Sequence, residues 1–495
     1  MTRPPENVPT QNSFGQKLFH CGTLTYTRAG LGQLYFWLLA GDFTYFMVES
    51  VVPSAIPLKF KSLHASNFLI ALVLSTIPKV ITGIFNPVIS FRSDRYRSRW
   101  GRRIPFIAAT LPFLVLCFLG LAFVDSIGPW LGRTFPSWEQ AFSREMLVLI
   151  VLSAFLIAFD FFNTFVTSVF WYLFNDVVPQ ELISRFTSYF RMVIMVTGIV
   201  YSHYCQPYVE SHYRELFLGA AAFYFLGFGA MCLFVKEGKY PPPLENTDGK
   251  TGALSSLKTY ARECMTLPHY WYLFLWSIFG TIAGACGIFG IFFQRETMGL
   301  TQMDVSNLAT IGAVTALVTV PICGWLGDKF HPLRILLLGN VLALIISPID
   351  FIWVWWRPGP HVYFWFTAFK TMFLSCPIGM MCQMDMPMFM RLLPKERFGQ
   401  YCSCRVLLTN LAGILTGSFG GVYLDYLTKY YGENTAYACI PFWSFTFSLL
   451  AVFFLVKLYR SWLRYGGDES YIPPIPAHSR AEVLAHSEPP SPTPL

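Results

Sequence analysis

Nine ionisable side chains stand inside long apolar runs of this 495-residue chain. They are Asp42, Glu49, Lys79, Asp160, Arg191, Asp350, Lys370, Asp385 and Arg405. A charged side chain at the centre of a bilayer costs about 2.5–3.5 kcal/mol on insertion scales. Such groups therefore pair with one another or face a watery cavity, where they can bind a polar solute or exchange a proton.

Two of the apolar runs carry polar side chains along one predicted helix face. Residues three, four or seven positions apart share a face, so Asp42, Tyr45 and Glu49 are aligned. The second run aligns the set Asp160, Asn163, Thr164, Thr167 and Trp171. Carboxylates, amides and hydroxyls beside an indole suit a sugar, because sugar hydroxyls need directional partners and the C–H face of the ring stacks on an aromatic group.

Lys79 lies at a comparable depth and has the sign to neutralise Asp42 or Asp160. Two interpretations stay open for these three residues. They are either buried ion pairs that hold helices together or a site that binds substrate and couples a cation, and we favour the second.

The composition indicates a membrane protein. The chain is 54% hydrophobic and 13% charged, whereas a soluble domain carries about 25% charged residues. Its net charge of +8 comes with arginines placed in loops between apolar runs, which favours a topology signal over nucleic-acid binding. The 12 cysteines show no zinc spacing and are interpreted as buried thiols.

Twelve apolar segments reach the roughly 20 residues that a membrane helix needs. They are 33–58, 66–91, 104–124, 146–174, 186–206, 215–235, 268–294, 303–326, 334–356, 362–390, 403–426 and 436–458. With the N-terminus inside, the inner loops carry 17 Lys and Arg and the outer loops carry 8. This bias predicts an all-α integral membrane protein of the plasma (inner) membrane with both termini in the cytoplasm.

A polar segment divides the spans into two sets of six. We expect a cytoplasmic tail at 1–32, a six-helix bundle at 33–235, a cytoplasmic linker at 236–267, a second bundle at 268–460 and a disordered cytoplasmic tail at 461–495. The halves repeat weakly, since Asp94-Arg95 after span two matches Asp328-Lys329 after span eight. Two pseudo-symmetric six-helix bundles with substrate between them are typical of major-facilitator transporters.

The loop between spans two and three carries a longer signature. It reads Asn86-Pro87, Ser93-Asp94-Arg95 and Arg97-Ser98-Arg99-Trp100-Gly101-Arg102-Arg103, followed by Pro105-Phe106-Ile107. These residues resemble the signature of glycoside–pentoside–hexuronide:cation symporters, the family of melibiose carriers, and plant sucrose–proton carriers share a similar loop. The resemblance implies the major facilitator fold and uptake of a sugar or glycoside coupled to a cation.

The resemblance also implies roles for single residues. In melibiose carriers an aspartate in span one, a basic residue in span two and an aspartate in span four serve sugar binding, which corresponds to Asp42, Lys79 and Asp160 here. Basic residues in spans five and eleven of that family correspond to Arg191 and Arg405, which we expect to contact substrate or to latch the halves.

One departure from the family concerns the cation. Its sodium-using members carry two further span-two aspartates, at positions matching Thr82 and Asn86 here. Neutral groups do not offset a sodium ion as carboxylates do, so we expect proton coupling. Asp42, Glu49 and Asp160 are the candidate proton carriers.

The arginine-rich loop has a second predicted role besides topology, as a cytoplasmic gate. Asp94 would pair with Arg95, Arg102 or Arg103 while the protein faces outward. Asp328 and Lys329 would form a weaker version in the second half.

No cofactor, metal site or catalytic set is expected, because the sequence lacks a phosphate-binding glycine loop and an H-E-x-x-H motif. The expected partners are a small-molecule substrate, a co-transported cation and the bilayer, and we expect a monomer. Three alternatives stay open: a carrier of the same fold for an organic anion or a lysolipid, a membrane sensor that binds solute without moving it, and, least favoured, an enzyme.

Overall fold

The computed structural model describes residues 18–21, 23–179, 182–238, 265–394 and 398–474. Within them the regular structure is helical apart from one short antiparallel hairpin of β1 (Phe19–Cys21) and β2 (Leu24–Tyr26), in which Phe19 pairs with Tyr26. The predicted linker and the C-terminal tail fall largely on residues 239–264 and 475–495, which lie outside the described part.

Each of the twelve predicted spans coincides with a helical segment of the described chain. In the first half these are α1 (Arg28–Ser62), the continuous rod α2–η1–α3 (Asn67–Ala71, Leu72–Thr76, Ile77–Arg95), α4 (Ile104–Ala122), α7 (Arg144–Val177), α8 with η3 (Ile183–Val200, Tyr201–Cys205) and α9 (Tyr213–Phe234). In the second half they are α11 continued by η5, α12 and η6 (Pro268–Ala283, Gly287–Phe289, Gly290–Phe292, Phe293–Thr297), α13 (Gln302–Lys329), α14 with η7 (Pro332–Ile346, Ser347–Val354), α15 (Pro360–Leu392), α16 (Phe398–Tyr431) and α18 (Ile440–Arg464).

Nine helical stretches of the described chain are long and apolar enough to cross a membrane by length and composition alone. Helices α1, α8 and α15 fall outside this set. They contain the charged residues Asp42, Glu49, Arg191, Lys370 and Asp385. The prediction of an all-α membrane protein is confirmed, and three of its helices are less apolar because they carry the side chains singled out above.

Hydroxyl side chains fix where several helices begin. Thr27, Ser66, Ser143 and Thr301 each accept a hydrogen bond from a backbone N–H in the first turn that follows. Such caps satisfy N–H groups that have no partner inside the helix. Two short helices in the loop between α4 and α7, α5 (Val124–Thr134) and α6 (Pro136–Ala141), were not anticipated from the sequence.

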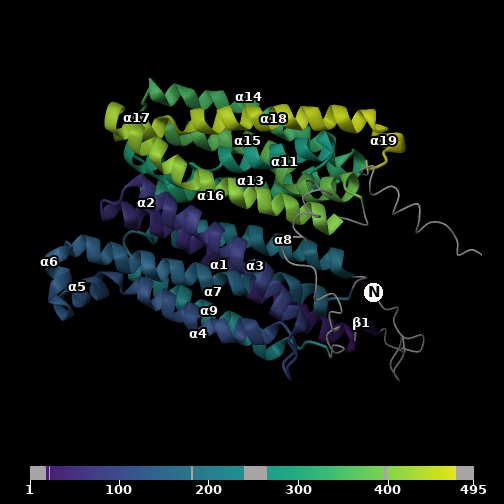
Figure 1. Cartoon of the computed structure of the whole chain (residues 1–495), viewed down its shortest axis with the longest axis horizontal. Coiled ribbons are helices and arrows are strands. Elements are labelled where there is room, and N and C mark those ends of the chain that lie inside the picture. The colour runs from purple at the N-terminus through teal and green to yellow at the C-terminus, as the bar shows by residue number, and fades with distance from the viewer. Residues whose placement is uncertain (1–17, 22, 180–181, 239–264, 395–397, 475–495) are drawn as a thin grey trace, which may run out of the picture.

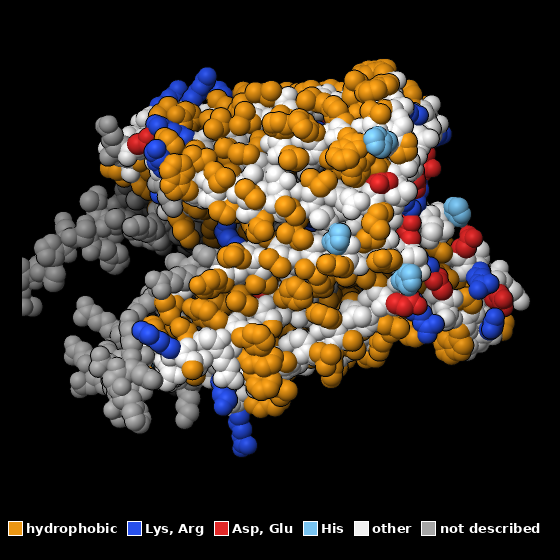
Figure 2. Space-filling view, turned by 180° about the vertical axis from the view of Figure 1, so that it is seen from behind, with side chains coloured by type: hydrophobic (Ala, Val, Ile, Leu, Met, Phe, Trp, Pro, Cys, Tyr) orange, Lys and Arg blue, Asp and Glu red, His pale blue; other side chains and the backbone are white. Residues whose placement is uncertain are grey.

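The two halves lie one above the other as layers of roughly parallel rods (Figure 1). Helices α5, α6 and α17 (Glu433–Ala438) lie at one end, and β1 and α19 (Gly467–Ser470) lie at the other. We call the end with α5, α6 and α17 the far end. The end with β1 and α19 is the loop end, because the arginine-rich loop that follows α3 lies there. On the face shown in Figure 2, hydrophobic side chains cover the middle and charged side chains gather toward the two ends, as expected for a protein whose middle contacts lipid.

The buried core is shared between the halves in an uneven way. One cluster joins the first half to far-end residues of the second half, such as Phe289, Phe292 and Tyr437. A separate cluster, which includes Tyr270, Met384 and Trp462, belongs to the second half alone. Apolar packing therefore joins the two halves at the far end.

Candidate functional site

Three adjoining cavities, each with polar side chains among its lining residues, lead from the interface between the halves into the first half. The largest, about 560 Å³, is walled by both halves, through α1, η3, α12, α13 and α15. Its polar lining consists of Ser50, Ser54, Tyr201, Ser202, Gln206, Gln294, Thr367 and Thr371. We call it the interface cavity, and none of its lining side chains is charged.

The second cavity, about 190 Å³, shares the wall residue Pro53 with the interface cavity. It brings two carboxylates together, Glu49 from α1 and Asp160 from α7, and we call it the carboxylate cavity. Asn163 donates its side-chain N–H to Glu49 at 2.6 Å. Ile288 of the second half also lines this cavity, so the two acids lie close to the boundary between the halves.

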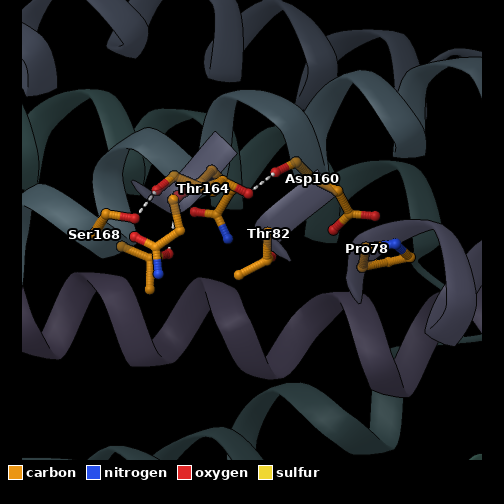
Figure 3. A pocket seen from close by; sticks show the side chains of 8 residues that line it. Pro78, Thr82, Asp160, Thr164 and Ser168 are labelled. Carbon is orange, nitrogen blue, oxygen red and sulfur yellow. Dashed lines mark hydrogen bonds between the residues drawn. The ribbon is translucent and has the colours of Figure 1, made fainter. Parts of the chain in front are cut away.

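The third cavity, about 240 Å³, lies between α3 and α7 and shares Pro78, Asp160 and Asn163 with the carboxylate cavity. Thr82 of α3 lies across from Thr164 and Ser168 of α7 (Figure 3). The hydroxyls of Thr164, Thr167 and Ser168 each donate to the carbonyl oxygen four residues earlier, of Asp160, Asn163 and Thr164. Their oxygen lone pairs remain available as acceptors at the cavity wall.

Several of the predicted site residues lie close together. Glu49, Asp160 and Asn163 line one cavity, and the Tyr45 hydroxyl lies 3.1 Å from that of Thr167. Tyr224 of α9 donates to Asn163 from the other side at 3.4 Å, a contact that no sequence pattern had indicated. The Trp171 side chain lies outside the described part of the chain.

Asp42 and Lys79 do not join this group. Asp42 is 0% exposed, and neither carboxylate oxygen has a hydrogen-bond partner among the described residues. It is absent from the lining of the three cavities. Among the described residues no ion pair links Lys79 to Asp42 or Asp160, so the expected three-residue cluster is not assembled.

Lys79 points instead toward the second half. Its ammonium lies 3.2 Å from the Ser75 hydroxyl, and a Cβ added at Gly413 of α16 would lie 2.6 Å from Nζ. Successive residues of a helix point in directions about 100° apart. Pro78 lines the carboxylate cavity, so Lys79, the next residue, faces α16 instead.

A row of glycines on α16 allows this approach. Gly413, Gly417 and Gly421 are spaced by four residues and so share one face. A Cβ at Gly417 would lie 2.7 Å from the Thr76 hydroxyl, and one at Gly421 would lie 2.5 Å from the Asn67 carbonyl oxygen. Small residues at this spacing let membrane helices approach closely.

Polar contacts reinforce the junction of the halves at the far end. Asp425 of α16 accepts from the backbone N–H of Asn67 at 3.1 Å, from the Asn67 side chain at 2.8 Å and from the backbone N–H of Phe68 at 2.9 Å. Lys61 contacts Glu433 and lies 2.9 Å from the Tyr437 hydroxyl. Sequence reasoning missed this set: Lys61 and Glu433 lie outside the predicted apolar spans, and Asp425, at the end of span eleven, was not singled out.

The two arginines predicted in spans five and eleven, Arg191 and Arg405, both contact α15. Arg191 binds the side-chain oxygen of Gln383, which links the two halves. Arg405 forms a two-pronged ion pair with Asp385 at 3.1 and 3.0 Å, and donates from Nε to the Ser277 hydroxyl at 2.9 Å. The charge of Arg405 is balanced, whereas the partner of Arg191 is neutral.

At the loop end, the arginines are held by two acids that sequence reasoning did not single out. Arg102 pairs with Asp176 at 2.5 and 2.9 Å, and Arg103 reaches the same carboxylate at 3.2 Å. Glu237 accepts from the backbone N–H groups of Arg102, Arg103 and Ile104 at 2.9, 2.8 and 2.6 Å.

The remaining gate residues are only partly described. The side chains of Asp94, Arg95 and Asp328 lie outside the described part. Lys329 lies over the Trp325 ring at 5.3 Å from its centroid. The predicted role of Arg102 and Arg103 in a cytoplasmic gate with Asp94 stays a prediction, and the acid described as their ion-pair partner is Asp176.

Comparison with protein families agrees with this architecture. The family model of the Major Facilitator Superfamily matches residues 38–415. The chain belongs to the major facilitator superfamily. It is therefore an integral membrane protein of a transporter family, and its fold is that of a major facilitator.

Solved structures support the fold of this major facilitator. A D-xylose–proton symporter is 14% identical with a TM-score of 0.60, covering 86% of this chain and 97% of its own. The nucleoside transporter NupG is 11% identical with a TM-score of 0.57, covering 86% and 99%. An inward-facing bacterial homologue of the human lysosomal transporter Spinster is 16% identical with a TM-score of 0.58, covering 88% and 97%. No curated protein sequence matches this chain.

Proposed function

We propose that this major facilitator is a secondary active transporter that carries a sugar or glycoside together with a proton by alternating access. The observation that supports this most directly is the series of polar cavities. An uncharged cavity between the halves adjoins a pair of carboxylates through the shared wall residue Pro53.

The interface cavity has the chemistry for a neutral polyhydroxylated solute. Its hydroxyl and amide groups both donate and accept hydrogen bonds, as each sugar hydroxyl requires. Its volume of about 560 Å³ falls in the about 300–1,000 Å³ range of small-molecule sites. Because both halves line the cavity, a bound solute can shift the equilibrium between conformations in which the halves are closed or open around it. Alternating access requires such a shift.

Glu49 and Asp160 are the groups best placed to carry the proton. Two carboxylates lining one small cavity repel each other when both are ionised, which favours a shared proton. Asp42 is a third candidate, since an ionised carboxylate without a partner is costly to bury. Thr82 and Asn86 in the adjoining cavity offer no further negative charge for sodium.

The far-end contacts support a state in which the protein is closed on the outside. The polar contacts and shared apolar core described above join the halves there, while the described ion pairs of Arg102 and Arg103 stay within the first half. We therefore assign this conformation as inward-facing, with both termini in the cytoplasm and the chain in the plasma membrane. Membership of the glycoside–pentoside–hexuronide:cation family and a monomeric state belong to the same proposal.

One observation favours a second candidate, an organic anion such as a sugar acid. Arg191 of α8 is exposed, and the one partner described for it is the neutral amide of Gln383 on the other half. A substrate carboxylate would pair with this guanidinium, which binds such groups in a two-pronged manner.

Uptake into vesicles that contain the purified full-length protein tests the proposal. Radiolabelled mono- and disaccharides, a hexuronate and a lysophospholipid are offered under an imposed pH gradient. We expect accumulation of at least one neutral sugar, which a protonophore abolishes and replacement of sodium by choline leaves unchanged. Accumulation of the hexuronate alone would establish the second candidate. A strict sodium requirement, or uptake of the lysophospholipid only, would overturn the proposal, as would binding without uptake.

A further inference from the structure

The arginine-rich loop points its basic residues in two directions. Arg102 and Arg103 turn inward onto Asp176. The preceding residues form a tight turn, in which Ser98 and Gly101 exchange backbone hydrogen bonds at 3.1 and 3.2 Å. Arg99 and Trp100 form the tip of this turn and are exposed, and the Trp100 side chain is 62% exposed.

Glycine is required at the end of this turn. Gly101 has φ 108°, a conformation that L-residues with a side chain rarely adopt. A Cβ there would also collide with the Glu237 side chain. The Glu237 carboxylate thus packs against the turn while it binds three backbone N–H groups of residues 102–104. The position of Arg99 and Trp100 is fixed by this anchor.

The tip of the turn forms one wall of a cavity of about 550 Å³ on the outer side of the first half, between α4 and α9. Its apolar part is lined by Ile104, Ala108, Leu111, Gly229 and Leu233. Leu233 is 74% exposed, so the cavity is a groove that opens toward the surroundings of the protein. In a membrane, an apolar groove of this kind faces acyl chains.

The polar end of the groove carries unbalanced positive charge. Arg99 and Lys236 line it, and no hydrogen-bond or ion-pair partner is described for either side chain. Glu237 is the acid among the lining residues, so two positive side chains face one negative one, and the Glu237 carboxylate is held against the backbone N–H groups of residues 102–104. Exposed Trp100 lies between this basic end and the apolar groove, a position that indoles favour at a membrane interface.

We propose that this groove is a binding site for an anionic phospholipid of the leaflet at the loop end. Arg99 and Lys236 would pair with the headgroup phosphate, Trp100 would lie beside the glycerol region, and an acyl chain would fill the groove along Leu111, Gly229 and Leu233. Basic pockets between transmembrane helices that open on an apolar surface bind anionic headgroups in this manner. The proposal is independent of which solute is carried.

The structure also predicts a consequence for the loop. The lipid would hold the same turn that Glu237 anchors, and Arg102 and Arg103 follow this turn directly. Occupancy of the groove is therefore expected to stabilise the folded loop and to raise the midpoint of thermal unfolding.

Lipid binding to the full-length protein in detergent, measured by native mass spectrometry, tests the site. The probes are a phosphatidylglycerol and a phosphatidylcholine with identical acyl chains. Each basic residue near an anionic surface contributes about 1 kcal/mol, and about 1.4 kcal/mol corresponds to tenfold in affinity. The double variant Arg99→Gln, Lys236→Gln should therefore bind phosphatidylglycerol roughly thirtyfold more weakly, and should lose much less affinity for phosphatidylcholine, whose choline already offsets its phosphate charge.

Two further variants separate this site from general surface charge. Arg460→Gln with Arg464→Gln removes two exposed basic residues of α18 near the same end and should leave phosphatidylglycerol binding unchanged. Gly229→Leu should fill the groove, because a Cβ there meets only Leu111, at 3.9 Å, and should weaken binding of phosphatidylglycerol without changing the basic residues. The proposal would be overturned if both double variants lost the same affinity for phosphatidylglycerol or if the two lipids bound equally well. It would also be overturned if Gly229→Leu bound phosphatidylglycerol as the wild type does.

Discussion

Replacing Asp425 by alanine should loosen the far-end junction of the halves. Its carboxylate accepts three hydrogen bonds from Asn67 and Phe68 on the opposite half. Two of the donors are backbone N–H groups at the start of α2, which have no partner within their own helix. Asp425 therefore caps a helix of the other half, and this cap exists only while the halves are closed at the far end.

The magnitude follows from these contacts. A hydrogen bond to a charged group contributes about 1.5–3 kcal/mol, but the three share one carboxylate and do not add fully. A total of about 3 kcal/mol, at about 1.4 kcal/mol per tenfold, shifts the closed-to-open equilibrium roughly hundredfold. Asp425→Asn keeps one oxygen and should show an intermediate effect.

Hydrogen–deuterium exchange of the peptide that spans residues 64–72 measures this shift, because amides exchange when the contact opens. The expected result is roughly hundredfold faster exchange at Asn67 and Phe68 in Asp425→Ala. Asp304→Ala is the matched control, since Asp304 caps its own helix through Thr301, and it should speed exchange only near residue 301. Unchanged exchange at Asn67 and Phe68 in Asp425→Ala would refute the reasoning.

Three further predictions concern the glycine row of α16, the arginine-rich loop and an ion pair of the second half. Gly417→Val should hinder closure of the far end, because a side chain there meets the Thr76 and Ser75 hydroxyls at 2.7 and 2.9 Å; it should raise exchange in the 64–72 peptide, and wild-type exchange would contradict this. Arg102→Ala with Arg103→Ala removes the two ion-pair partners described for Asp176 and should slow transport turnover more than it weakens substrate binding; unchanged turnover in correctly inserted protein would leave the loop as a topology signal. Lys370→Met leaves Asp350, 2.6 Å away, without its cation and should lower stability by about 2–3 kcal/mol, somewhat less than for a fully buried pair. Adding Asp350→Asn should recover part of this loss, as measured by thermal unfolding. A double variant as unstable as the single variant would contradict the pairing.

The spans were predictable from the sequence because apolar length and loop charge are local properties. Twelve expected segments coincide with helices, including α1, α8 and α15, in which single charges interrupt the apolar run. Helix periodicity placed Glu49 on one face and Asp160 with Asn163 on another, and these three residues line one cavity, whereas Asp42, predicted on the same face as Glu49, does not line it.

What the sequence does not contain is the rotation of one helix against its neighbours. Lys79 has the depth to reach Asp160, yet it faces Gly413 of the other half. Glu237 and Asp176 gave no signal as partners of Arg102, because they are 135 and 74 residues away along the chain. The interface cavity was missed because serine, threonine and glutamine are ordinary residues in a helix until two halves place them face to face.

Proton movement on addition of substrate tests the central claim most directly. Weakly buffered vesicles containing the full-length protein and a trapped pH indicator receive the neutral sugar identified by the uptake screen, without an imposed gradient. The account predicts that sugar entry alkalinises the medium and acidifies the vesicle interior. Asp160→Asn and Glu49→Gln should abolish this signal while sugar-for-sugar exchange persists, whereas Asp125→Asn, at the far-end contact with Lys59, should behave as wild type. Sugar entry without proton entry, or a full proton signal in both carboxylate variants, would contradict the account.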